Sequence, residues 1–316
     1  MTHQAVFMRR SLCIIPGFRC QLACPHCISG SSPADDRELT EREMTALCGS
    51  LEERFVETLS FSGGEPVLYL DKVVRLGRSA TKINPNVSIR LTTNARFASS
   101  LDACNKVFVQ ISNLSSIRIS YDDLHSSENG LASVATIVRW AAQADVRCSI
   151  NVSAVHPLDL VVLRSLPSLG VPINVAKVAP FGRASRIASN LAWQEDVRTI
   201  RDKMSTKCNS LAKAVYFPGR GWTFCCSEVA FNHSKLDSLF FSSSLEDLGL
   251  VPALKKMQEL TFNELFELTP HFEEKPVHEC QICAAYWEGT ATGESSGRLG
   301  NAAGLNTRRQ TTHAQF

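Results

Sequence analysis

The sequence predicts an α/β protein in which a parallel sheet with helices outside it is followed by a smaller unit of mixed structure. Over the first two-thirds of the chain, apolar β-branched runs alternate with helical patterns. About six strand–helix repeats of this kind give a parallel sheet, either open and doubly wound or curved into a barrel. Near Met204 the pattern changes to short, turn-rich elements. In a parallel sheet, functional residues lie on loops at the carboxyl ends of strands.

The predicted elements follow one another in a regular order. Residues 40–43, Thr-Glu-Arg-Glu, have the form of a capping box, and Met44, Leu47, Leu51 and Phe55 follow at helical spacing. The fourth strand has two candidate positions, residues 107–111 and residues 117–120. The other strands are predicted at residues 11–15, 58–61, 87–92, 148–155 and 173–178, and further helices at residues 71–80, 130–144 and 158–166.

The smaller unit begins after residue 205. A hairpin is predicted around residues 217–222, which contain Pro218, Gly219 and Gly221, and a helical stretch at residues 245–260. From residue 289 onward the composition is rich in Gly, Ala, Ser, Thr, Asn and Arg, which predicts a flexible tail. The expected organisation is therefore a core at 1–205, a second domain at 206–288 and a tail at 289–316.

Composition excludes several function classes. There are 33 Lys and Arg against 31 Asp and Glu, a formal net charge of +2, so no global basic charge points to nucleic acid or to an anionic membrane. Apolar runs of about 18 residues and a signal peptide are absent, which predicts a cytoplasmic protein with no membrane partner. In that compartment the twelve cysteines are expected to be metal ligands or catalytic groups more often than disulfides.

The first cysteine group is Cys20, Cys24 and Cys27, spaced Cys-x3-Cys-x2-Cys directly after the first predicted strand. Thiolates so close together can converge on one zinc or iron–sulfur centre, although unrelated thiols remain an alternative. A structural zinc site normally has four ligands, and His26 would have to fold back to complete it. A [4Fe–4S] cluster held by three cysteines keeps one iron open for a substrate or cofactor.

This spacing resembles the motif of the radical S-adenosylmethionine (SAM) superfamily, in which a ring residue usually precedes the third cysteine, as His26 does here. Ser62-Gly63-Gly64-Glu65-Pro66 follows the second strand and resembles the Gly-Gly-Glu-Pro motif of that family, which receives the methionine amino group of SAM. Glycines allow the backbone to approach a cofactor closely, and Glu65 supplies negative charge for an ammonium.

Three later segments extend the resemblance. Residues 91–95 resemble the Thr-Asn-Gly segment of the family through Asn94, with Ala95 departing at the last position. Ser120 and Asp122 resemble the Ser-x-Asp often found beside the SAM ribose. Residues 180–184, Pro-Phe-Gly-Arg-Ala, match a segment that commonly follows the sixth strand. Over residues 8–205, the resemblance implies a partial (β/α)6 barrel with the cluster and SAM at its open top.

The second cysteine group is Cys208, Cys225, Cys226, Cys280 and Cys283. Its spacing, Cys-x(9–15)-Gly-x4-Cys followed by Cys-x2-Cys, resembles the opening of the SPASM motif and its four-cysteine form, the twitch domain, a small α+β extension. The resemblance implies a second, auxiliary [4Fe–4S] cluster on Cys208, Cys226, Cys280 and Cys283. Cys225 is the alternative ligand to Cys226, and a four-thiolate zinc site is the alternative to the cluster.

As a radical SAM enzyme, the chain would cleave SAM reductively to a 5′-deoxyadenosyl radical that abstracts a hydrogen atom, with electrons from a donor such as flavodoxin or ferredoxin. Only nineteen residues precede Cys20, which favours a small natural-product substrate, a cyclitol or aminosugar, over a peptide bound through its leader. The enzyme would then be an oxidoreductase or an epimerase. Crosslinking, thioether formation or epimerisation of a ribosomal peptide is the alternative, and a non-catalytic iron–sulfur redox sensor is another.

Cys225 has two possible roles beside the auxiliary cluster. As a hydrogen-atom donor it would serve an epimerase, whereas in a dehydrogenase the cluster would take the electron and Cys225 would be dispensable. The second role is expected, because unassigned cysteines usually pack in the core.

Overall fold

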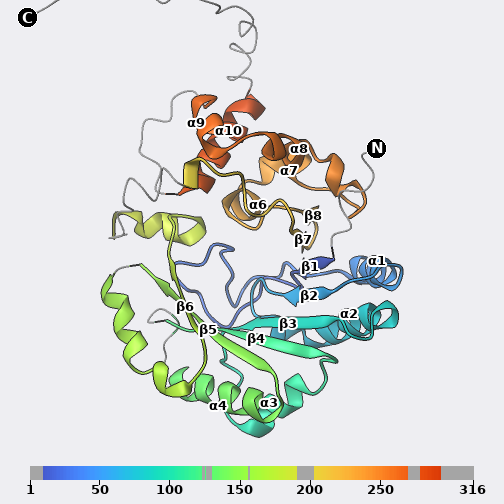
Figure 1. The fold of residues 1–316 in the computed structure, drawn as a ribbon, viewed down its shortest axis with the longest axis vertical. Helices are drawn as coiled ribbons and strands as arrows, with labels where there is room; N and C mark the ends of the chain where they lie inside the picture. Colours follow the sequence, from blue (N-terminus) through green and yellow to red (C-terminus); the bar gives the residue numbers. More distant parts are fainter. Residues whose placement is uncertain are drawn as a thin grey trace, which may run out of the picture.

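The computed structural model describes residues 10–122, 125, 130–155, 157–190, 203–269 and 278–292. Its described strands form one sheet in the order β6-β5-β4-β3-β2-β1-β7-β8 (Figure 1). All neighbouring strands are parallel except β7 and β8, which form an antiparallel hairpin. The strands are β1 (Ser11–Ile14), β2 (Thr58–Phe61), β3 (Ser88–Thr93), β4 (Leu114–Ser120), β5 (Arg147–Ala154), β6 (Ile173–Lys177), β7 (Ala214–Phe217) and β8 (Gly221–Thr223).

Strands β1 to β6 lie side by side in chain order. A doubly wound sheet needs a point at which the strand order reverses, whereas right-handed crossovers in unbroken order place every helix on the same face. The sheet is therefore a barrel wall, and it is an open one, because β6 and β1 do not pair within the described strands. Of the two alternatives that the sequence allowed, the barrel is the one that forms.

The helices between the strands follow the predicted pattern closely. The capping box forms, with Thr40 accepting from the Glu43 backbone and Glu43 accepting from the Thr40 backbone. The elements are α1 (Glu41–Glu52), η2 (Pro66–Tyr69), α2 (Leu70–Ile83), α3 (Leu101–Phe108), α4 (Gly130–Gln143), η3 (Pro157–Arg164), η4 (Pro167–Leu169) and η5 (Gly182–Asn190), where η denotes a 3-10 helix.

Three details differ from the prediction. The first candidate for the fourth strand, residues 107–111, overlaps the end of α3, where Phe108 packs on Trp140 of α4, and the strand is at 114–120 instead. Phe55 lies beyond α1 and is 45% exposed, so it is no part of the buried helix face. The segment at 158–166 forms 3-10 turns rather than a regular α-helix.

The two faces of the sheet have different chemistry. Ile89, Ile117 and Ile150 belong to one face and are buried in the main core with the helices. Side chains alternate along a strand, so the intervening residues point the other way. That second face carries Ser60, Arg90, Thr92, Ser116, Arg118 and Ser149, among others.

The C-terminal part joins the same sheet. β7 pairs with β1 in parallel, and the predicted hairpin turns back through β8. Above it in Figure 1 lie short helices, of which α10 packs on α9 and α6. They are α6 (Glu228–Asn232), η6 (Ser234–Leu236), α7 (Asp237–Phe240), η7 (Asp247–Leu250), α8 (Pro252–Glu259), α9 (Phe262–Glu267) and α10 (Glu279–Thr292). The first residues of the predicted tail belong to α10, and residues 293–316 lie outside the described residues.

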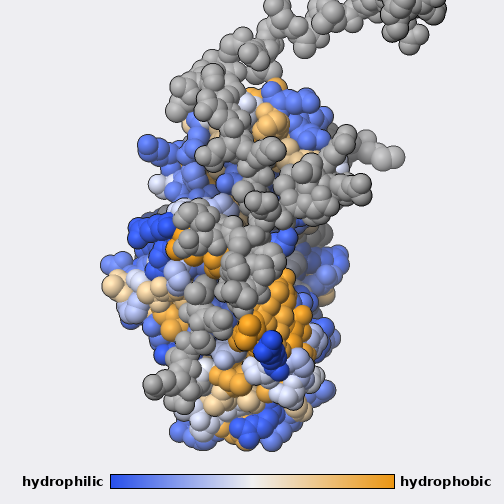
Figure 2. Space-filling model, turned by 90° about the vertical axis from the view of Figure 1, so that its left-hand side faces the viewer, coloured by the Kyte–Doolittle hydropathy of each residue, from blue (hydrophilic) through white to orange (hydrophobic). Residues whose placement is uncertain are grey.

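Figure 2 shows a mixed polar and apolar surface, with apolar atoms gathered in patches on the side that carries β6 and η3. Val161 of η3 and Val175 of β6 are about half exposed on this side. No helix in the described part of the chain is long and apolar enough to cross a bilayer.

Candidate active site

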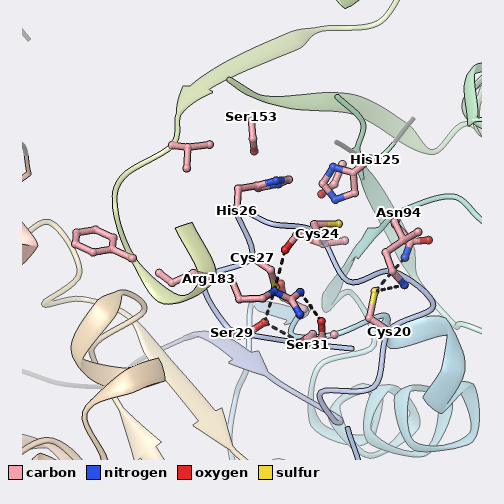
Figure 3. Close-up of a pocket in the computed structure, with 18 of the residues that line it drawn as sticks. Cys20, Cys24, His26, Cys27, Ser29, Ser31, Asn94, His125, Ser153 and Arg183 are labelled. Carbon is pink, nitrogen blue, oxygen red and sulfur yellow. Dashed lines mark hydrogen bonds between the residues drawn. The ribbon is translucent and has the colours of Figure 1, made fainter. Parts of the chain in front are cut away.

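Loops at the carboxyl ends of the parallel strands enclose a cavity of about 420 Å³. Each of the six strands of the barrel wall contributes to it. Figure 3 shows the cysteine loop together with Asn94 and Ser153 around this cavity. The contributions, in strand order, are the cysteine loop after β1, Gly63 and Gly64 after β2, Asn94 after β3, Ser120 of β4, Ser153 of β5 and Lys177 of β6. This is the place where the sequence predicted a functional site.

Hydrogen bonds from the segment after β6 hold the cysteine loop in place. Arg183, in the segment after β6, donates from Nε to the carbonyl of Cys24 at 2.9 Å and from Nη2 to the carbonyl of Ser31 at 2.6 Å. Gly182 lies so close that a Cβ there would be 2.3 Å from the Ile28 carbonyl oxygen, and its φ is +54°. Only glycine fits such an approach without strain. The segment at 180–184 is thus a clamp on the cysteine loop.

All three predicted cysteines line the cavity. The Cys20 sulfur accepts from Leu22 N and from Asn94 Nδ2, each at 3.4 Å, and the Cys27 sulfur lies 3.2 Å from Ser29 Oγ. Burial raises the pKa of Cys20, and the Leu22 amide opposes that rise. Hydrogen bonds to sulfur support thiolate ligands of iron–sulfur clusters. The three residues therefore fit a cluster that has one open iron.

Gly63 and Gly64 line the cavity and also pack against the strand-to-cysteine segment. A Cβ on Gly64 would be 2.3 Å from the Arg19 carbonyl oxygen, and Gly63 has a φ of +120°. The amides of Gly64 and Glu65 donate to the carbonyls of Gly17 and Arg19. The glycines thus let two loops meet beneath the cysteines.

Glu65 lies behind the cavity wall, 1% exposed and absent from the cavity lining. Its carboxylate accepts from Val67 N at 3.2 Å and from Asn94 N at 2.7 Å, and so joins the loops after β2 and β3. Burial raises its pKa to about 7, although these amides favour the charged form. Pro66 is buried too and starts η2.

The conformation of the loop after β3 explains why the resembled motif has glycine at its last position. Ala95, where the resembled motif has glycine, is 1% exposed and adopts a φ of 64°. This left-handed conformation favours glycine. The turn places the side chain of Asn94 against Cys20 and Gln21, which it reaches through Nδ2 at 3.4 and 3.2 Å.

His26, Asp122 and His125 form a compact group at the cavity wall. Asp122 is fully buried and lies 2.8 Å from His125 Nδ1 and 3.7 Å from His26 Nε2. Burial acts to lower the pKa of His125, but its hydrogen bond to Asp122 prevails and raises that pKa to about 10. Among the described residues, these are the only three potential metal ligands whose donor atoms all lie within 4.8 Å of one another. The ion pair between Asp122 and His125 accounts for that closeness.

The predicted cofactor residues therefore divide into two sets. Gly63, Gly64, Asn94 and Ser120 line the cavity, whereas Glu65, Pro66 and Asp122 support it from behind. Sequence reasoning did not single out His125 or Lys177, which also line it. His125 follows the Ser-x-Asp segment by three residues, a spacing that could have drawn attention to it.

The second cysteine group gathers from three segments. Ser210 N donates to the Cys208 sulfur at 3.4 Å, and Ser210 Oγ lies 3.2 Å from the Cys226 sulfur. Cys280 and Cys283 lie on α10, with Cys283 buried. Burial raises the pKa of Cys283, and the neighbouring thiols of Cys225, Cys280 and Cys208 raise it further. The fold thus brings the five cysteines into one neighbourhood.

Comparison with known proteins identifies the barrel. The model of the radical SAM superfamily matches residues 14–156, which include the cysteine loop and the glycine motif. Residues 14–156 are a radical SAM domain. A radical SAM domain implies SAM and a [4Fe–4S] cluster as cofactors.

Relatives and solved structures agree with this identification. The mycofactocin maturase MftC of Mycobacterium ulcerans is 26% identical over 197 residues, which cover 56% of this chain and 48% of that protein. The chain therefore spans about half the length of the curated relatives it matches. Streptococcus suis SuiB bound to the precursor peptide SuiA has a TM-score of 0.52 at 13% identity, covering 85% of this chain and 74% of SuiB. The SAM-bound SuiB structure gives 0.51 at 14%, covering 85% and 75%. The fold prediction, a radical SAM partial barrel, is confirmed.

Proposed function

We propose that this radical SAM protein cleaves SAM reductively at a cluster held by Cys20, Cys24 and Cys27, and that its substrate is a peptide. One observation carries the first part: segments far apart in the sequence, each matching a family motif, converge on one cavity at the carboxyl ends of the strands. When bound, the cluster and SAM supply an electron and a 5′-deoxyadenosyl radical that abstracts hydrogen from the substrate.

The residues of the chain have distinct tasks in this function. Gly63, Gly64 and Asn94 shape the SAM side of the cavity, while Ser120 lines it at the end of β4. Glu65 connects two of these loops and gives the wall a negative charge once it is ionised. Arg183 fixes the cysteine loop so that the three sulfurs face the cavity.

A second, auxiliary [4Fe–4S] cluster on Cys208, Cys226, Cys280 and Cys283 is part of the proposal. Zinc bound to thiolates through bonds of about 2.3 Å holds its sulfurs about 3.8 Å apart. Among the described cysteines, no three sulfurs lie within 4.8 Å of one another. A cubane holds each thiolate on a different iron and so does not need three sulfurs this close together. The auxiliary cluster would accept or relay electrons, since four thiolates occupy all its irons.

A peptide is the better supported substrate class. The curated relatives are maturases, and one structure of similar fold holds a precursor peptide. The cyclitol or aminosugar expected from the sequence receives no comparable support. Which bond is made or broken, and whether the outcome is oxidation, epimerisation or crosslinking, depends on the substrate. A one-electron donor such as flavodoxin or ferredoxin would reduce the cluster.

The test is SAM cleavage. Protein reconstituted anaerobically with iron and sulfide is mixed with SAM and dithionite, and 5′-deoxyadenosine is measured by mass spectrometry. We expect 5′-deoxyadenosine and methionine in equal amounts from the wild type and none from the Cys20→Ala/Cys24→Ala/Cys27→Ala protein. A reconstituted wild type that binds iron but forms no 5′-deoxyadenosine would support the redox-sensor alternative and refute the proposal.

A further inference from the structure

The polar face of the sheet borders a second cavity, of about 470 Å³, which we call the lumen. Its polar lining on the strands includes Ser60, Arg90, Ser116, Arg118 and Ser149. A closed (β/α)8 barrel fills its interior with layers of mostly apolar side chains. Here the interior face instead presents hydroxyls and guanidinium groups.

The lumen is positively charged. Arg90, Arg118 and Lys213 line it, and no aspartate or glutamate does so among the described residues. Within the same part of the chain, Arg90 and Arg118 form no ion pair, and both side chains are exposed. Guanidinium groups at protein surfaces commonly have carboxylate partners nearby. Two adjacent ones without partners provide a site for an anion.

Strand register places the two arginines side by side. Arg90 of β3 is level with Ser116 of β4, and Arg118 is level with Thr92 of β3. Both arginines therefore project from the same face of neighbouring strands, two residues apart along the strand direction. Ser60 of β2 is level with Arg90 and Ser149 of β5 is level with Arg118, so a hydroxyl flanks each guanidinium.

The lumen adjoins the radical site. Ser62, Gly63 and Thr92 line both cavities, as do Ile28 and Ser29 of the cysteine loop. A group held by the arginines would therefore be next to the place where SAM is cleaved. On the other side, Cys226 also lines the lumen, with Lys213 Nζ 3.6 Å from its sulfur. A substrate in the lumen would lie between the two cysteine groups.

We propose that Arg90 and Arg118 bind a carboxylate of the peptide substrate and so position the peptide for hydrogen abstraction. This proposal rests on the proposed function, because an unmodified peptide carries its oxyanions as carboxylates, on Asp, Glu or the C-terminus. Guanidinium forks bind carboxylates through paired, charge-assisted hydrogen bonds, which fix orientation as well as position. Arg90 and Arg118 are substrate-positioning residues, distinct from the SAM-side residues.

Calorimetric titration of the reconstituted, SAM-bound protein at fixed ionic strength tests this. The matched probes are N-acetylglutamate N-methylamide and N-acetylglutamine N-methylamide, which differ only in the charge of one side chain. N-acetylalanine offers a terminal carboxylate instead, and inorganic phosphate offers a different oxyanion. Wild type, Arg90→Gln, Arg118→Gln and the control Arg139→Gln are compared. Arg139 is exposed on α4, outside both cavities, so its replacement removes the same charge elsewhere.

We expect at least one carboxylate probe to bind the wild type and the Arg139→Gln protein about tenfold or more tighter than the glutamine probe or phosphate. We expect this preference to disappear in Arg90→Gln and in Arg118→Gln, since each loses a charge-assisted contact. The preferred carboxylate distinguishes a side chain from a chain terminus.

Three results would overturn the carboxylate site. They are equal binding of the glutamate and glutamine probes with no binding of N-acetylalanine, tighter binding of phosphate, and an equal loss in Arg139→Gln. The wild-type comparison decides the matter even if a variant folds poorly. Formation of 5′-deoxyadenosine by the same wild-type preparation is measured in parallel, so failure of SAM cleavage is distinguished from failure of the lumen to bind carboxylates.

Discussion

The first cysteine group comes from one short loop after β1. The second group comes from three segments that are spread in the sequence between Cys208 and Cys283. The first loop is fastened by partners from elsewhere, Arg183 after β6 and Asn94 after β3. The second group exists only because β7 joins β1 and because α10 packs on α6 and α9. A local motif thus needs the fold for rigidity, while a dispersed one needs it to exist at all.

The largest expected effect is the loss of SAM cleavage when a cysteine of the first group is replaced. Cys24→Ala should abolish 5′-deoxyadenosine formation. If the chain binds the two proposed cubane clusters, the iron content should fall from about eight to about four per chain, because one cluster is lost. The second group should keep its iron, since its cysteines belong to different segments. Iron analysis and mass spectrometry measure both. Cys148→Ala on β5 is the matched control, and a similar loss of iron in that variant would point to misfolding.

Replacing a cysteine of the second group tests whether SAM cleavage depends on that group. Cys280→Ala should also leave about four irons per chain, but 5′-deoxyadenosine formation in the absence of substrate should persist. The physical reason is that SAM cleavage needs only the first cluster and its cavity. Wild-type protein with about four irons and one zinc would instead assign the second group to zinc and would contradict the auxiliary cluster.

Features that a short stretch of sequence encodes are easier to predict than features that depend on contacts between distant segments. The predicted bounds of β2 agree with the structure, because a short β-branched and apolar run there is followed by glycines. The spacing of Cys20, Cys24 and Cys27 is by itself enough to predict them as one group of ligands. The fourth strand was ambiguous because residues 107–111 are as apolar as the true strand, and only packing on Trp140 makes that segment end a helix.

Residues that act through distant partners were the hardest to predict. Glu65 is predicted to contact the cofactor, and its carboxylate also accepts from the amide of Asn94, a contact that no local pattern encodes. Asp122 is predicted to lie beside the SAM ribose, and the pairing of its carboxylate with His125 is a contact that the Ser-x-Asp pattern does not encode. Arg90 and Arg118, which form no ion pair within the described residues, are placed side by side only by the register of β3 and β4.

A smaller effect is expected at Glu65, and it depends on pH. The pKa of this buried carboxyl is raised to about 7, so below pH 7 it is mostly neutral and above pH 7 mostly charged. If it pairs with the ammonium of SAM, SAM affinity should rise between pH 6 and pH 8 in the wild type. Glu65→Gln should bind SAM about ten- to a hundredfold more weakly at pH 8, without the rise, because a charge-assisted hydrogen bond is lost.

Equilibrium binding of SAM to the reconstituted protein measures this pH dependence. Glu52→Gln, at a half-buried position on α1 outside the cavity lining, is the control for a lost carboxylate. Wild-type affinity that does not change with pH would show that Glu65 acts only by joining the loops at Val67 and Asn94. The first group would then rely on neutral contacts to SAM.

The smallest expected effect is that of replacing Cys225, the neighbour of Cys226 in the second group. The Cys226 sulfur accepts from Lys213 Nζ at 3.6 Å and lies 3.2 Å from Ser210 Oγ. Donors of this kind favour a thiolate ligand. Burial raises the pKa of Cys225 to about 12, which keeps its proton in place. Cys225 is nevertheless an electrostatic neighbour of Cys280 and Cys283. The two cysteines therefore compete for one ligand position.

We expect Cys225→Ala to keep about eight irons and Cys226→Ala to keep about four, if both clusters are cubanes. The reverse result would assign the ligand to Cys225 and free Cys226, which lines the lumen, to face the substrate. Once a substrate is known, turnover in deuterated water separates the two chemical roles. Deuterium at carbon in the wild-type product, lost together with turnover in Cys225→Ala, would identify a hydrogen-donating thiol. A deuterium-free oxidised product from both proteins is the expected outcome, because the radical then loses a proton and passes its electron to the auxiliary cluster.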